Sequence, residues 1–196
     1  VLNPTIVSKI EPITLVGGAE VSQELFFAAI ALGPRIIAAD GGAAQVLAYD
    51  AMPECVIGDM DSLDASDRAR IAADRIISVS EQDSTDFEKV LQRVIAPICL
   101  GVGFLGGRVD HELAALSALV RYAHRKVILM GEDDIIFALP PSFALHLPTE
   151  ERVSLFPMGA CKVTSDGLYW PTNSLEFHPT AQIGTSNKAT GPIDLT

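Results

Sequence analysis

The chain has 196 residues, of which 48% are hydrophobic and 20% charged, values typical of a folded globular protein rather than a disordered one. With 14 basic against 25 acidic residues and a net charge of -11, it lacks the basic surface that neutralises phosphates, so we expect no nucleic-acid partner. No apolar run approaches the roughly 18 residues of a membrane span and no signal-peptide pattern opens the chain, so we expect no membrane partner and a cytoplasmic location.

The first two thirds of the chain alternate short apolar runs with helical patterns. Strands are predicted at 13–16, 35–39, 55–57, 75–79, 97–102 and 126–130, and helices at 22–32, 43–49, 86–95 and 111–123. Continuous apolar strands separated by helices indicate a parallel sheet that is covered on both faces. We therefore expect an α/β domain over residues 1–133.

After about residue 135 the helical periods end and turn residues break up short strand-like runs. These runs cover 135–139, 143–147, 153–156, 162–164 and 175–178. They predict a small antiparallel β domain over residues 134–196. Within it we expect Trp170 to pack in the core rather than to stack on an aromatic ligand.

Acidic residues follow the predicted strands at the edge where open parallel sheets bind ligands. They are Asp40, Asp59, Asp61, Asp83, Asp86 and Asp110. Carboxylates that crowd together raise each other's pKa, so such an edge holds protons or a cation. Oxygen ligands without nearby His or Cys suit Mg²⁺, which in turn binds polyphosphate. A solvated loop with an Asx turn is the alternative for Asp59 and Asp61.

The loop before the helix at 111–123 has the composition of a phosphate site. Gly106-Gly107 lets the backbone approach a ligand, the helix N-terminus offers amide donors, and Arg108 could clamp a phosphate. A surface pair with a carboxylate is the alternative for Arg108, and His111 is equally compatible with a phosphate donor and a helix-start residue. A Gly-x-Gly-x-x-Gly match ends at Gly106 but follows four strands, which disfavours a nicotinamide enzyme, and no P-loop motif is present.

The three cysteines are far apart and form no Cys-x-x-Cys pair, so we expect no zinc site. Cys55 and Cys99 lie in or beside apolar runs. Both are expected to be buried free thiols in a reducing compartment.

Six motifs follow one another between residues 13 and 188. They are Ala39-Asp40-Gly41-Gly42-Ala43, Ile57-Gly58-Asp59-Met60-Asp61-Ser62, Gln82-Asp83-Ser84-Thr85-Asp86-Phe87, Gly106-Gly107-Arg108-Val109-Asp110-His111, Gly167-Leu168-Tyr169-Trp170 and Thr185-Ser186-Asn187. Taken together, they resemble the thiamine pyrophosphokinase family. The resemblance implies an ATP-binding catalytic domain, a thiamine-binding β-sandwich domain, and transfer of a diphosphoryl group from ATP to the hydroxyl of thiamine, giving thiamine diphosphate and AMP.

The resemblance also implies the roles of individual residues. Mg²⁺ would be held by Asp59, Asp61, Asp83 and Asp86. ATP would face Asp40, Gly41, Gly42, Ser62, Thr85, Gly106, Gly107, Arg108 and His111. Thiamine would face Gln82, Ser186 and Asn187, the last two from the partner subunit of a homodimer with its active sites at the subunit interface. The catalytic set would be Asp59, Asp61, Asp86, Arg108 and Asp110. From the acidic edge itself we expect Asp86 or Asp110 to accept the hydroxyl proton.

Three features depart from the family pattern. Ser84 stands where relatives often carry Lys or His, and Lys188 stands where an acid is frequent. The sequence stops nine residues after Asn187, so we expect either a truncated end or a different hold on thiamine. Two other functions stay open: a metal-dependent nucleotide-sugar transferase, and a non-catalytic sensor of thiamine or nucleotide.

Overall fold

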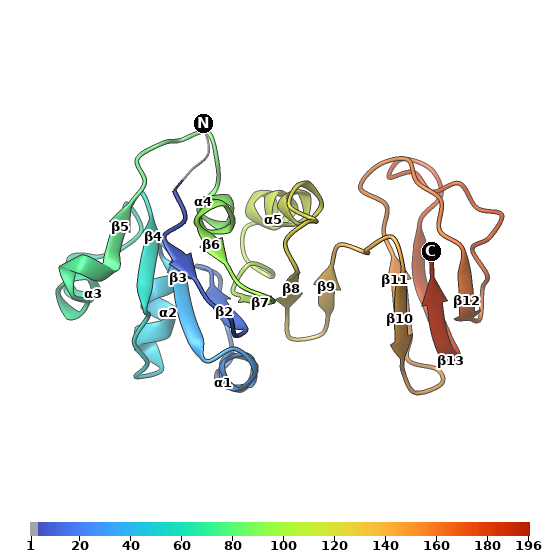
Figure 1. The fold of residues 1–196 in the computed structure, drawn as a ribbon, viewed down its shortest axis with the longest axis horizontal. Helices are drawn as coiled ribbons and strands as arrows, with labels where there is room; N and C mark the ends of the chain where they lie inside the picture. The colour runs from blue at the N-terminus through green and yellow to red at the C-terminus, as the bar shows by residue number, and fades with distance from the viewer. Residues whose placement is uncertain (1–3) are drawn as a thin grey trace. The chain divides into compact units, whose positions relative to one another are not determined.

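The computed structural model describes residues 4–196 and divides into two compact units, one ending at Ala138 and the other covering Leu139–Thr196 (Figure 1). Each unit has its own sheet. None of the helices in the described residues is long and apolar enough to span a membrane.

The first unit is built on a seven-stranded sheet in the order β5-β4-β3-β2-β7-β8-β9. Its strands are β2 (Ile13–Val16), β3 (Arg35–Ala39), β4 (Cys55–Gly58), β5 (Ile76–Ser78), β7 (Cys99–Val102), β8 (Val127–Met130) and β9 (Ile135–Phe137). The helices are α1 (Gln23–Leu32), α2 (Gly42–Ala48), α3 (Ala65–Arg70), α4 (Asp86–Arg93) and α5 (Val109–Arg121), with a 3₁₀ turn at Ala73–Arg75. A separate parallel pair joins β1 (Val7–Ser8) to β6 (Val94–Ile95).

Alternate residues of the buried strands face two different cores. Leu15 and Ile37 pack in a core with residues of α4 and α5, whereas Val16 and Ala38 pack in a second core with residues of α1 and α2. Figure 1 shows α4 and α5 above the sheet and α1 and α2 below it. The expectation of a sheet covered on both faces is therefore confirmed.

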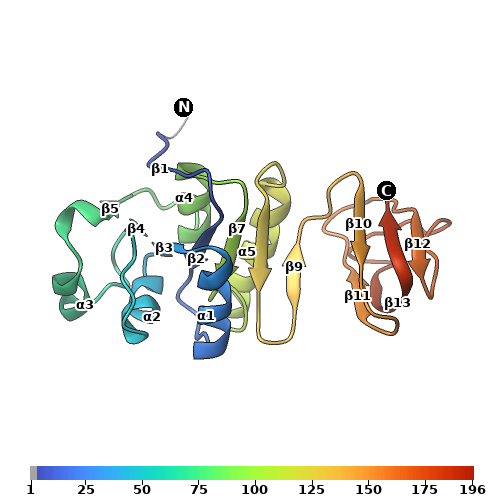
Figure 2. The same cartoon turned by 60° about the horizontal axis from the view of Figure 1, so that its bottom comes forward.

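The sheet is mixed rather than purely parallel, because β9 runs antiparallel to β8. The run at 135–139 was expected in the β domain. Instead, a tight turn in which the Gly131 N–H donates to the Asp134 carbonyl (2.8 Å) folds β9 back onto β8. Figure 2 shows β9 as the last strand of the first unit. As a consequence the first unit extends to Ala138, beyond the boundary after residue 133 that the sequence suggested.

The second unit is antiparallel, as the sequence predicted. Its strands are β10 (Phe143–His146), β11 (Arg152–Leu155), β12 (Ser165–Leu168) and β13 (Gly184–Leu195). The first three all pair with β13, whose Ala189, Ile193 and Leu195 form the small core with Leu168 of β12.

Three details of the β domain differ from expectation. The runs at 162–164 and 175–178 form no strand of their own, and only an isolated bridge joins Cys161 to Phe177. The long β13 was not expected. Trp170 is 53% exposed rather than buried, because it lies in the bend that follows β12. Cys55 and Cys99, in contrast, are buried free thiols as predicted.

Candidate active site

Asp40 lies at the carboxyl end of β3, in a turn that brings three strands close together. Its φ of +39° is in the left-handed region, and its N–H donates to the Ile57 carbonyl of β4 (3.0 Å). A Cβ on Gly42 would lie 2.0 Å from the Val16 carbonyl oxygen, and one on Gly58 would lie 2.5 Å from the Asp40 Cβ. Glycine at these two positions therefore allows the strand ends to approach one another.

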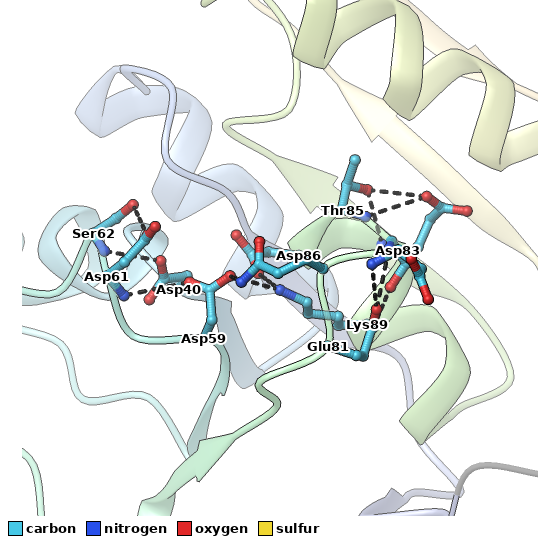
Figure 3. A network of polar contacts seen from close by, with 12 residues as sticks. Asp40, Asp59, Asp61, Ser62, Glu81, Asp83, Thr85, Asp86 and Lys89 are labelled. Carbon is cyan, nitrogen blue, oxygen red and sulfur yellow. Dashed lines mark hydrogen bonds and ion pairs between the residues drawn. The ribbon is translucent and has the colours of Figure 1, made fainter.

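Three of the predicted carboxylates form what we call the acidic cluster: Asp40, Asp59 and Asp61. Each offers one oxygen, and these oxygens all lie within 4.8 Å of one another. Ser62 supports the arrangement, because its N–H donates to Asp40 Oδ2 (3.1 Å) and its hydroxyl to Asp61 Oδ1 (2.9 Å). The Asp61 N–H donates to Asp59 Oδ1 (3.3 Å), as Figure 3 shows.

One oxygen of the cluster is buried without a partner. Asp40 is 1% exposed, and its Oδ1 accepts no hydrogen bond from the residues that the structure describes. Burial raises the pKa of the Asp40 carboxyl above its usual value. A buried carboxylate oxygen without a donor is costly, and a hard cation would satisfy it. The cluster therefore has the ligand chemistry that Mg²⁺ requires.

The sequence did not single out Lys89, which lies beside the cluster. Its Nζ donates to Asp59 Oδ2 (2.9 Å) and to Asp86 Oδ1 (3.0 Å). The hydrogen bond from Lys89 to Asp59 lowers the pKa of Asp59 to about 2. Burial alone would lower the pKa of Lys89, but its bonds to the two carboxylates raise it, so the group stays an ammonium. Gln82 Nε2 also donates to Asp59 Oδ2 (3.1 Å), which places this residue at the cluster.

Thr85 and Asp83 lie in the segment between Gln82 and Asp86. Thr85 caps α4 in a capping box: its Oγ1 accepts from the Glu88 N–H (3.4 Å), and Glu88 Oε2 accepts from the Thr85 N–H (3.3 Å). Asp83 is not brought into the cluster. It lines a cavity of about 320 Å³ together with Glu81 and Ser84, and the Glu81 carboxylate accepts the Ser84 hydroxyl.

Arg108 and Asp110 pair with each other at the start of α5. Arg108 Nε and Nη2 donate to the two Asp110 oxygens (3.1 and 2.6 Å), and both side chains are exposed. The structure thus shows the surface pair that was the alternative for Arg108, and Asp110 does not join the cluster. Gly106 has a φ of +77° and donates to Glu112 Oε2 (2.9 Å), and His111 is exposed. To bind Arg108, a phosphate would have to replace the Asp110 carboxylate as its partner.

In the second unit, the side-chain amide of Asn187 makes two hydrogen bonds to the backbone of Trp170. Its Oδ1 accepts the Trp170 N–H (3.1 Å) and its Nδ2 donates to the Trp170 carbonyl (2.7 Å), while the side chain is buried. The exposed Trp170 ring lies edge-on to Tyr169, with 4.8 Å between ring centroids. Ser186 has a φ of +59° and its N–H donates to Ser154 Oγ (3.0 Å).

Comparison with known proteins gives consistent matches. The family model of the thiamin pyrophosphokinase catalytic domain matches residues 31–130, and that of the thiamin pyrophosphokinase vitamin B1 binding domain matches residues 143–194. Thiamine pyrophosphokinase 1 of Arabidopsis thaliana is 29% identical, with 77% of this chain and 69% of the relative covered. The rice protein of the same name is 27% identical, with 77% and 70% covered.

Solved structures of thiamin pyrophosphokinases have a similar fold. The structure from Candida albicans has a TM-score of 0.79 at 16% identity and covers 98% of this chain and 89% of its own. The structure from Bacillus subtilis has a TM-score of 0.78 at 22% identity and covers 95% and 94%. The two matched family ranges fall on the two units described above.

Proposed function

The chain belongs to the thiamin pyrophosphokinase family, and we propose that its acidic cluster is where the family's reaction takes place: transfer of a diphosphoryl group from ATP to thiamine. The thiamine hydroxyl oxygen attacks the β-phosphorus, the bond from that phosphorus to the α,β-bridging oxygen breaks, and AMP leaves. The observation that carries the proposal is the buried Asp40 Oδ1, which has no donor within residues 4–196, beside the Asp59 and Asp61 carboxylates.

Asp40, Asp59 and Asp61 would hold a Mg²⁺ ion. When bound, the ion would neutralise phosphate charge and orient the diphosphoryl group. Without a cation, the net charge of -11 and the three adjacent carboxylates would repel a polyphosphate. Ser62 contributes by fixing two of the three carboxylates through its N–H and hydroxyl.

The phosphate side of the site would be completed by the loop before α5. Arg108 is charged, exposed and able to exchange Asp110 for a phosphate, because exposed pairs contribute little stability. For the thiamine hydroxyl proton we propose Asp86 as the acceptor, because Lys89 holds it beside Asp59 of the acidic cluster. Asp110 pairs with Arg108 away from the cluster.

For thiamine we propose contacts from Gln82 and from the Ser186 segment, with Asn187 acting indirectly by fixing the exposed Trp170. We also propose a homodimer in which Ser186 of the partner subunit completes each site. Sedimentation at micromolar concentration tests the dimer, and a monomer with full turnover would contradict it. The family membership does not favour the sensor or the nucleotide-sugar transferase.

Asp61→Asn tests the metal assignment, because it keeps the side-chain shape and removes one charge. We expect the Mg²⁺ concentration for half-maximal AMP formation to rise at least roughly tenfold. Asp74→Asn, at an exposed aspartate in the 3₁₀ turn outside the cluster, is the matched control. Unchanged magnesium dependence in the Asp61 variant would show that the cluster does not hold the metal.

The metal set implied by the resemblance and the set favoured by the geometry differ at three positions. The resemblance includes Asp83 and Asp86, whereas the geometry includes Asp40. Comparing Asp40→Asn with Asp83→Asn in the same titration separates them. We expect the larger loss of apparent Mg²⁺ affinity in the Asp40 variant, and the reverse order would favour Asp83 as the ligand.

A further inference from the structure

Lys89 is the only fully buried lysine in the part of the chain that the structure describes. Its side chain is 2% exposed, although it lies in the first turn of α4. This helix packs on β3 and β4, and the neighbours Phe87 and Val90 belong to the core beneath it. The four-carbon stem is therefore held in packed surroundings, and the ammonium cannot swing out into water.

The ammonium joins two carboxylates from separate parts of the chain. Asp59 follows β4, whereas Asp86 is the first residue of α4. Each lies within 3.0 Å of Nζ. Figure 3 shows Lys89 pointing at this pair, with Asp40 and Asp61 on the other side of Asp59. Asp59 thus touches the ammonium and also belongs to the acidic cluster.

This arrangement resembles a site for two cations that share one bridging carboxylate. In enzymes that use two metal ions, the ions lie close together and clamp the same phosphoryl group. Here Asp59 has the position of the bridging ligand, the acidic cluster has the position of the first ion, and the ammonium of Lys89 has the position of the second. A lysine ammonium is a compact point charge that suits such a place.

We propose that Lys89 is a built-in second cation, so that the protein itself binds one divalent ion, at Asp40, Asp59 and Asp61. The inference rests on the proposed metal site. Any further divalent ion must then arrive with the nucleotide. Lys89 is a positioning residue: it acts through Asp59 and Asp86 and does not itself touch the substrate.

The competing explanation is that Lys89 only ties α4 to the loop after β4. Both explanations predict that Lys89→Met is harmful, so activity alone does not separate them. They differ in metal binding. If the ammonium fills a cation position, removing it leaves Asp59 and Asp86 adjacent and unneutralised, and a divalent ion takes its place. A purely structural tie leaves no new cation position.

The test counts bound Mn²⁺ per chain from the electron paramagnetic resonance signal of the free ion, without nucleotide or thiamine. We expect one ion in the wild type and two in Lys89→Met. The matched control is Lys9→Met, which removes a lysine that pairs with Glu54, the residue preceding β4 at the opposite end of that strand. It is expected to bind one ion.

Each result has a separate meaning. One ion in the wild type and one or none in Lys89→Met overturns the inference but leaves the metal site standing, whereas no ion in the wild type contradicts the proposed function itself. If Lys89→Met is unfolded in EDTA, millimolar Mg²⁺ should refold it, measured by circular dichroism. A variant that stays unfolded in Mg²⁺ also overturns the inference, because a divalent ion should replace the ammonium.

Discussion

Replacing Asp40 by asparagine should stabilise the protein without metal and weaken its response to metal. The Asp40 carboxylate is 1% exposed, its Oδ1 has no donor among the residues that the structure describes, and its Oδ2 accepts the Ser62 N–H. A buried polar group left without a partner costs about 1–3 kcal/mol. An asparagine keeps the acceptor for Ser62 and can donate its amide hydrogens to the neighbouring carboxylates of the cluster.

The backbone at this position also favours the change. Asp40 has a φ of +39°, a region that asparagine enters readily. We therefore expect Asp40→Asn to be more stable than the wild type by about 1–2 kcal/mol in EDTA, the lower part of the range for an unsatisfied group. Asp50→Asn is the matched control, because Asp50 is exposed and also has a positive φ, of 53°. Both substitutions remove one charge at a positive φ, so the difference between them isolates the effect of burying the Asp40 carboxylate.

Magnesium should reverse the order of stability. An ion at one hundred times its dissociation constant stabilises the folded state by about 2.7 kcal/mol. The wild type should gain this amount, and Asp40→Asn should gain much less because one ligand has lost its charge. Urea unfolding in EDTA and in Mg²⁺ measures both effects as shifts of the midpoint. The reasoning fails if Asp40→Asn is the less stable protein in EDTA, or if both proteins gain equally from Mg²⁺.

Three further predictions follow from packing. Gly42→Ala should destabilise the first unit by about 1–3 kcal/mol in urea unfolding, because its Cβ would overlap a carbonyl oxygen. The control Gly18→Ala, whose Cβ would have no atom nearer than 3.9 Å, should change the free energy of unfolding by no more than about 0.5 kcal/mol. Equal losses in the two variants would contradict the steric argument. Asn187→Ala should lower the free energy of unfolding by about 1–3 kcal/mol, because it leaves the backbone N–H and carbonyl of Trp170 without their Asn187 partners. The fluorescence of Trp170, the only tryptophan, should also change. An unaltered spectrum and unfolding midpoint would show that Asn187 does not hold Trp170 in place. At neutral pH a thiol reagent should label one cysteine per folded chain, the exposed Cys161, and three cysteines after unfolding. Burial shields Cys55 and Cys99 from the reagent and raises the pKa of their thiols. Rapid labelling of all three cysteines in the folded protein would be inconsistent with this burial.

The sequence predicts the acidic cluster well because its acids follow buried strands directly. Asp40 ends β3, and Asp59 and Asp61 follow β4, so adjacent parallel strands bring them together. Asp83 and Asp110 also follow strands, but their distance from the cluster depends on the path of the loops. Strand ends therefore identify candidates, while loop conformation decides which of them meet.

Lys89 was missed because a helical pattern does not show how much of a polar face is buried. The apolar positions of α4 indicate which side of the helix packs on the core. Lys89 lies beside that side and is also buried, because its ammonium pairs with the Asp59 and Asp86 carboxylates. The spacing of three residues between Asp86 and Lys89 is the one signal in the sequence, since such residues are neighbours on a helix.

The strands β9 and β13 show the limits of local patterns. An apolar run predicts that β9 is a strand but does not say which sheet it joins, and only the turn at Gly131 returns it to β8. β13 is largely polar and includes Gly191 and Pro192, residues that are rare inside strands. Pairing with three other strands stabilises it, and that information is not local.

The fate of the γ-phosphate of ATP tests the central claim most directly. Purified protein is incubated with thiamine, Mg²⁺ and ATP that carries ³²P in the γ-position, and the products are separated by chromatography. The account predicts that all label leaving ATP appears in thiamine diphosphate, with an equal amount of unlabelled AMP, and that EDTA abolishes both. Label in thiamine monophosphate or in free phosphate, with ADP as the second product, would contradict transfer of a diphosphoryl group.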